Sequence, residues 1–96
     1  MMKIVWSADA VADYEHNINY LLEAWGTKET QQFIDEVSEM LSTISKMPEL
    51  FPLSDYRNVR KCVVRKQISI LYRVSDKQIE LVRIWNNKQN PEKLKG

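Results

Sequence analysis

Several residue types that build common functional sites are scarce in this chain of 96 residues. The single cysteine, Cys62, excludes an internal disulfide, and together with the single histidine, His16, it offers too few ligands for a zinc site. The only glycines are Gly26 and Gly96, so the chain cannot form a glycine-rich phosphate-binding loop. We therefore predict a protein that uses no metal ion and no cofactor. Cys62 is interpreted as a buried structural residue and His16 as a surface residue.

Long hydrophobic runs are missing as well. No apolar segment approaches the ~18 residues of a transmembrane helix. The first residues also lack the apolar region of a signal peptide. These absences predict a cytoplasmic protein that makes no membrane contact. A chain of this length has the size of one domain, which we expect to span residues 1–96.

Two stretches with helical periodicity follow a short expected strand at residues 3–6. The first helix should begin after Ser7 as N-cap and end at Gly26, and the second should begin at Thr27 as N-cap and end before Pro48. Apolar residues at helical spacing predict the face that each helix buries. These faces are Val11, Tyr14, Ile18, Leu21, Leu22 and Trp25 in the first helix, and Phe33, Ile34, Val37, Met40, Leu41 and Ile44 in the second.

The second half of the chain is dominated by the β pattern. Strands are expected at residues 59–65, 68–74 and 79–85, joined by short turns, because β-branched residues are dense there and apolar residues alternate. Consecutive strands with short turns form an antiparallel sheet, and only this sheet offers a large apolar face to the helices. The order β-α-α-β-β-β therefore predicts an α+β fold of two layers, an antiparallel helix hairpin packed on an antiparallel sheet.

Charge is divided unevenly between the two halves. Residues 1–56 contain three Lys and Arg against ten Asp and Glu, whereas residues 57–96 contain eleven against three. The net charge of +1 thus conceals an acidic half and a basic half, a pattern typical of contact with a polyanion or an acidic partner. A simpler interpretation, in which the acidic residues form solvated helix faces, remains open.

The basic residues fall on the predicted sheet, which would hold them in fixed positions. Two-residue turns would place Arg60 opposite Arg73 and Val64 opposite Ser69 on one hairpin, and Arg73 opposite Glu80 and Leu71 opposite Val82 on the other. The helix-covered face would then hold Val63, Ile68, Ile70, Tyr72, Val74, Ile79 and Leu81, with Lys61, Arg65 and Arg83 at its rim. The other face would hold Arg60, Cys62, Val64, Ser69, Leu71, Arg73, Glu80, Val82 and Ile84.

Several short motifs together resemble the RelE/ParE superfamily of bacterial toxins from type II toxin–antitoxin systems. The motifs are Trp6-Ser7, Trp25-Gly26, the loop Pro48-Glu49-Leu50-Phe51-Pro52, Val59-Arg60-Lys61, Leu71-Tyr72-Arg73-Val74 and the tail from Lys88 to Leu94. The resemblance covers nearly the whole chain. It implies the fold predicted above, a role in plasmid stabilisation or growth arrest, and a cognate antitoxin as partner.

The two branches of the superfamily imply different targets. The ParE-like branch implies inhibition of DNA gyrase without chemistry, and the segment from Ile84 to Leu94 is more similar to this branch. The RelE-like branch implies metal-independent cleavage of mRNA on the ribosome, for which Arg60, Arg65 and Arg73 would be the catalytic candidates. However, Cys62 stands where a second basic residue is expected, and no Tyr or His follows Tyr72. We therefore favour the ParE-like branch.

A third hypothesis is a non-catalytic module that binds nucleic acid with the same basic sheet and stacks bases on Trp85.

For a gyrase-directed toxin, the expected target-binding surface consists of the basic residues of the sheet and its flanks. Its members are Arg60, Lys61, Arg65, Lys66, Arg73, Arg83, Trp85 and Lys88.

Overall fold

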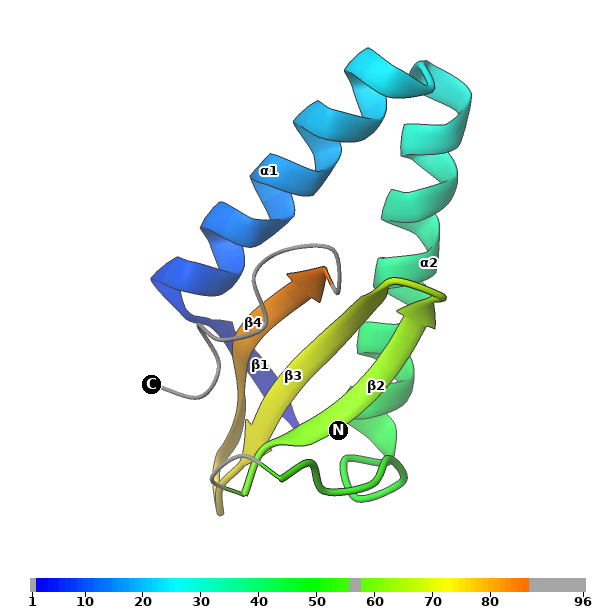
Figure 1. Cartoon of the computed structure of the whole chain (residues 1–96). Coiled ribbons are helices and arrows are strands. Elements are labelled where there is room, and N and C mark those ends of the chain that lie inside the picture. Colours follow the sequence, from blue (N-terminus) through cyan, green and yellow to red (C-terminus); the bar gives the residue numbers. More distant parts are fainter. Residues whose placement is uncertain (1, 56–57, 87–96) are drawn as a thin grey trace.

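A computed structural model describes residues 2–55 and 58–86 of the chain. Strand β1 (Lys3–Trp6) leads into helices α1 (Ala8–Ala24) and α2 (Thr27–Lys46). Strands β2 (Arg60–Arg65), β3 (Ile68–Val74) and β4 (Gln78–Asn86) follow. Figure 1 shows the two helices as a splayed hairpin on one side of the sheet. The predicted α+β fold is confirmed.

The sheet has the strand order β1-β4-β3-β2. β2, β3 and β4 form the predicted antiparallel meander, whereas β1 adds to β4 in parallel. Because the long excursion through both helices separates β1 from β4, the parallel pairing is sterically possible here. The sheet is therefore mostly, but not wholly, antiparallel.

The helix boundaries follow from local capping. The Ser7 hydroxyl accepts a hydrogen bond from the backbone N–H of Ala10 at 2.9 Å, which confirms Ser7 as the N-cap of α1. Gly26 ends α1 with φ of +90°, a conformation that glycine adopts without steric cost. Gly26 is also the N-cap of α2, so the prediction of Thr27 as N-cap is wrong by one residue. The Gly26 carbonyl instead accepts a hydrogen bond from the Thr30 hydroxyl at 2.8 Å.

Two β-bulges change the predicted register. Arg73 lies opposite Glu80 as expected, but Leu71 lies opposite Arg83, because the pairing shifts between Leu71 and Tyr72. The pairing of β2 with β3 shifts between Val63 and Arg65, so that Arg60 lies opposite Tyr72 and not Arg73. An extra residue in one strand moves every side chain beyond it to the other face.

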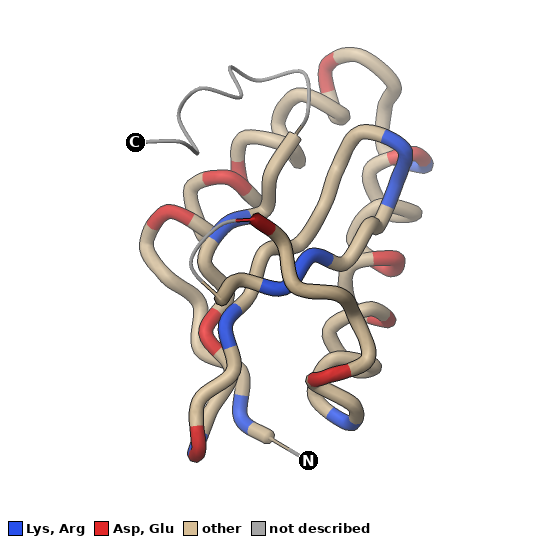
Figure 2. Tube along the Cα trace, turned by 60° about the horizontal axis from the view of Figure 1, so that its bottom comes forward, with Lys and Arg blue, Asp and Glu red and all other residues tan. Residues whose placement is uncertain are grey.

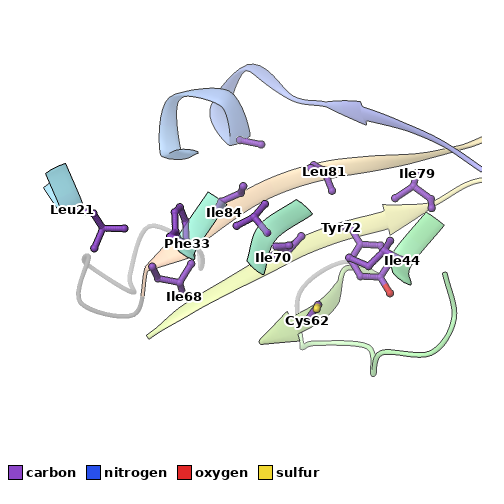
Figure 3. Packing of buried hydrophobic residues seen from close by; sticks show 12 residues of the cluster. Leu21, Phe33, Ile44, Cys62, Ile68, Ile70, Tyr72, Ile79, Leu81 and Ile84 are labelled. Atoms are coloured by element: carbon purple, nitrogen blue, oxygen red, sulfur yellow. The ribbon is translucent and has the colours of Figure 1, made fainter. Parts of the chain in front are cut away.

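The bulges therefore correct the predicted faces. Arg60, Cys62, Val64 and Ile84 belong to the helix-covered face, and Val63, Lys61 and Arg83 belong to the opposite face. Figure 3 shows Cys62 and Ile84 among the core residues beside Ile70 and Tyr72. The rest of the apolar face is as predicted, with Ile68, Ile79 and Leu81 buried.

The helices contribute to this core in different ways. α2 buries Phe33, Val37 and Ile44, as its apolar stripe predicts. α1 buries Ala10, Asp13, Asn17 and Leu21, so its predicted stripe is confirmed for half of its members and wrong for the other half. Three residues of that stripe, Val11, Leu22 and Trp25, are exposed, and Tyr14 and Ile18 are half-buried. Across the described residues, no helix has both the length and the apolar character needed to span a membrane.

Candidate functional site

The sheet surface opposite the helices, here called the open face, carries a basic and apolar set of side chains. A small cluster of Val59, Leu71 and Trp85 packs there with Val82. Lys61 and Val63 are exposed on β2, and Arg73 and Glu80 are half-buried on β3 and β4. Figure 2 shows most of the basic segments on the strands and the β2–β3 turn, and most of the acidic segments on the helices. The division of charge along the sequence therefore becomes a division in space.

Arg73 and Glu80 form the predicted cross-strand ion pair. Arg73 Nη1 lies 3.2 Å from Glu80 Oε1, and the two side chains are 39% and 46% exposed. A pair this exposed stabilises the fold by well under ~1 kcal/mol, since water and salt screen it. The pair therefore places Arg73 on the open face while leaving it accessible to a binding partner.

Arg60 lies on the helix-covered side of the sheet and not on the open face. Its Nη1 donates hydrogen bonds to the carbonyls of Phe51 at 2.7 Å and Glu49 at 3.4 Å. The same loop is held by Tyr72, whose hydroxyl donates to the Pro48 carbonyl at 2.7 Å. Arg60 and Tyr72 thus tie the proline-containing loop to the sheet.

Arg65 lies on the helix-covered side of the sheet, and its side chain is 23% exposed. Its guanidinium forms an ion pair with Glu36 of α2 and lies 5.5 Å from the centroid of the Phe33 ring. The neighbouring residue of the β2–β3 turn, Lys66, is exposed. Lys66 is therefore the more accessible of these two cations.

Arg83 is bound by a carboxylate from α1. Asp13 accepts hydrogen bonds from Arg83 Nε at 2.7 Å, Arg83 Nη2 at 2.8 Å and the backbone N–H of Ile84 at 3.1 Å. The Asp13 carboxylate continues the hydrogen bonding of β4 beyond the point where β1 ends. The Arg83 guanidinium also lies 5.3 Å from the Trp85 ring centroid. Trp85 itself is only 4% exposed, too little for a base to stack on it.

The other residues considered in the sequence analysis are Cys62, His16 and Lys88. The side chain of Cys62 is fully buried, and burial raises the pKa of its thiol to about 11, so Cys62 is no thiolate nucleophile near neutral pH. His16 is exposed on α1, as predicted. Within residues 2–55 and 58–86, no group of three metal-ligating side chains lies together. Lys88, the last predicted surface residue, falls outside the described residues.

The structure contains a cleft that sequence reasoning missed. It has a volume of about 440 Å³ and lies between the tip of the helix hairpin, the β2–β3 turn and the end of β4. Its lining combines apolar and charged groups, including Tyr20, Leu21, Trp25, Glu29, Lys66 and Ile68. Trp25 was assigned to the core because it fits the helical period of α1. Its position at the end of the helix, directly before Gly26, is the one signal in the sequence that sets it apart from the rest of the stripe.

Comparison with known proteins places this architecture in a family. The family model for the ParE toxin of the type II toxin–antitoxin system parDE matches residues 4–91. The chain belongs to the ParE toxin family. No match was found among curated protein sequences.

Solved structures support the fold at low sequence identity. A chain of the chromosomal ParDE toxin–antitoxin system from Pseudomonas aeruginosa has a TM-score of 0.78 and 20% identity, with 90% of this chain and 96% of that chain covered. The YoeB/ParE toxin from Agrobacterium tumefaciens has a TM-score of 0.66 and 15% identity, with 88% and 98% covered. The YoeB dimer from Staphylococcus aureus has a TM-score of 0.63 and 16% identity, with 88% and 94% covered. The chain therefore shares the fold of these ParE and YoeB toxin structures.

Proposed function

We propose that this ParE-family toxin arrests growth by binding DNA gyrase through the open face, without catalysing a reaction, and that a cognate antitoxin neutralises it. Such a pair would act as a plasmid-stabilisation module. The observation that carries the proposal is the separation of Arg60, Arg65 and Arg73. Each arginine contacts a different part of the molecule: the proline-containing loop, α2, and Glu80 on the open face.

The separation of these arginines favours a binding toxin over a nuclease. Phosphodiester cleavage without a metal needs cations converging on one phosphate and a group that moves the 2′-hydroxyl proton. Arg60 and Arg65 are on the helix-covered side, and Arg73 is on the opposite side of the sheet. The hydroxyl of Tyr72 is engaged with the Pro48 carbonyl, and burial raises the pKa of Tyr72, although Arg60 lowers it in part.

The open face has the composition of a protein-binding surface. Among the described residues its cations include Lys61, Arg73 and Arg83, and Lys61 lies two residues from the exposed side chain of Val63 on β2. A rigid sheet presents such groups at low entropic cost, since the backbone is already ordered before binding. Protein interfaces typically combine exposed apolar side chains with charged groups at the rim, and the open face offers Val63, which is 56% exposed, with Lys61 on the same strand.

The order in which synthesis stops tests the proposal. The chain is expressed alone in bacteria, and incorporation of labelled thymidine and labelled amino acids is followed immediately after induction. DNA synthesis should stop first, and the purified chain should inhibit supercoiling by purified gyrase. An early stop of protein synthesis accompanied by cleaved mRNA would instead identify an endoribonuclease.

A pair of double variants tests the surface itself. Lys61→Ala with Arg73→Ala removes the two most accessible cations among the described residues of the open face and should abolish inhibition of supercoiling. Lys28→Ala with Lys46→Ala removes two exposed cations from the helices and should leave inhibition intact. Equal inhibition by the two folded double variants would exclude the open face as the gyrase-binding surface.

A further inference from the structure

The cleft at the hairpin tip is the most exposed aromatic site of the described residues. Tyr20 is 53% exposed and Trp25 is 67% exposed, whereas the floor between them is formed by the buried side chains of Leu21 and Ile68. Exposed tryptophan and tyrosine beside a buried apolar floor are the residue types that dominate binding energy at protein interfaces. The volume of about 440 Å³ falls in the range of about 300–1,000 Å³ that is typical of ligand-binding pockets.

Charges of both signs flank the cleft. Lys66 of the β2–β3 turn is exposed on one side, and Glu29 in the first turn of α2 is half-buried on the other. Arg65 also lines the cleft, but its charge is compensated by Glu36. With one uncompensated cation, Lys66, and one carboxylate, Glu29, the lining offers no clear excess of positive charge for a nucleic acid, and it suits a polypeptide that carries an acidic and a basic side chain around an apolar one.

We propose that the cleft anchors the antitoxin, which inserts a large apolar side chain between Tyr20 and Trp25 and directs an acidic residue at Lys66 and a basic residue at Glu29. This inference rests on the proposed function, because it takes the existence of an antitoxin from there. The cleft opens between the helices and the sheet end, and its β3 residue Ile68 lies on the helix-covered face. It is therefore separate from the open face that binds the target. Loss of antitoxin binding and loss of toxicity should then be separable by substitution.

The test uses the purified full-length toxin and the protein encoded by the gene adjacent to its own. Affinity is measured by isothermal titration calorimetry. Tyr20→Ala combined with Trp25→Ala should lower the affinity at least about 100-fold, as expected when two interface hot spots are removed. The same variant, expressed alone, should still arrest growth, and coexpression of the adjacent gene should no longer rescue the cells.

A matched control separates the cleft from exposed apolar surface in general. Leu50→Ala combined with Leu53→Ala removes two side chains that are 56% and 57% exposed and lie outside the cleft. This variant should bind the antitoxin within about threefold of the wild type. All four positions are more than half exposed, so both double variants should fold, which circular dichroism and thermal melting will verify.

Each alternative result has a distinct meaning. If the Tyr20→Ala/Trp25→Ala variant binds as tightly as the wild type, the cleft is not the anchor, and the proposed function is unaffected. If the wild type itself fails to bind the adjacent gene product, both proposals fall. If the wild type sediments as a dimer and the double variant as a monomer, the occupant is a second copy of this chain, and the antitoxin assignment is overturned.

Discussion

The two helices of the hairpin have similar lengths, but different interactions attach them to the sheet. α2 buries an apolar stripe, and its Phe33 ring packs 5.9 Å from that of Tyr14 on α1. α1 lies along β4, where it buries Asp13 and Asn17 and leaves Val11, Leu22 and Trp25 to solvent. α1 thus combines apolar contacts through Ala10, Tyr14 and Leu21 with the buried polar contacts of Asp13 and Asn17, and it leaves part of its apolar surface to solvent.

The largest expected effect concerns the apolar attachment of α2. Phe33→Ala removes a fully buried ring that contacts Tyr14 and the Arg65 guanidinium, so the free energy of unfolding should fall by about 3–5 kcal/mol. Urea denaturation followed by circular dichroism measures this loss. Ile34→Ala, one residue further along α2 and only half-buried, is the control and should cost about 1–2 kcal/mol. Equal losses at both positions would show that Phe33 is not the central contact of α2.

The polar attachment of α1 should be nearly as important. Asp13→Asn removes the charge that faces Arg83 and weakens three hydrogen bonds at the open edge of β4. We expect a loss of about 3 kcal/mol, since the substitution removes the charge of the more deeply buried partner of this ion pair. The measurement is again chemical denaturation.

Asp9→Asn serves as the control for this prediction. It makes the same chemical change in the first turn of the same helix, but Asp9 is exposed. Only its favourable interaction with the helix dipole is lost, which costs about 0.3–1 kcal/mol. A similar small loss for Asp13→Asn would mean that the carboxylate does not hold α1 on β4.

The sequence analysis predicted the apolar attachment of α2 but not the polar attachment of α1. Element order, the α2 stripe and the Arg73–Glu80 pair were predictable, because periodicity and short turns determine them. The buried face of α1 was not predictable. Asp13 and Asn17 have the polar character of surface residues, and their partners Arg83 and Asn86 lie some seventy residues away in the sequence. Propensity and pattern carry no information about such distant pairs.

In the sheet, the sequence analysis could not predict which face each basic residue occupies. All the basic residues were identified from the sequence, but the bulges at Val64 and Val82 could not be, since neither position carries a glycine or proline signal. One bulge was enough to move Arg60 to the helix side. The face on which a strand residue lies is therefore more sensitive to a single extra residue than the fold is.

Cys62 offers a probe of how tightly α2 covers the sheet. The raised pKa of about 11, caused by burial, means that the folded state retains the thiol proton more strongly than the unfolded state, whose value is near 9.0. The contribution of the protonated Cys62 thiol to the stability of the folded state is complete below pH 9 and is lost as the pH rises through about 11. At pH 8, alkylation by iodoacetamide should be limited by unfolding. Rapid alkylation of the native protein would indicate that α2 separates locally from the sheet and exposes Cys62.

The smallest expected effect concerns the solvent side of α1. Leu22→Gln replaces a leucine that is 45% exposed by a polar residue of similar helix propensity, so the free energy of unfolding should change by no more than about 0.5 kcal/mol. A loss comparable to that of Phe33→Ala would mean that Leu22 is covered, and its dependence on protein concentration would reveal whether a second copy covers it. A negligible change would show that Leu22 contributes little to folding. Leu22 would then belong to the exposed apolar surface of α1 that also includes Val11 and Trp25, the residue that lines the proposed antitoxin cleft.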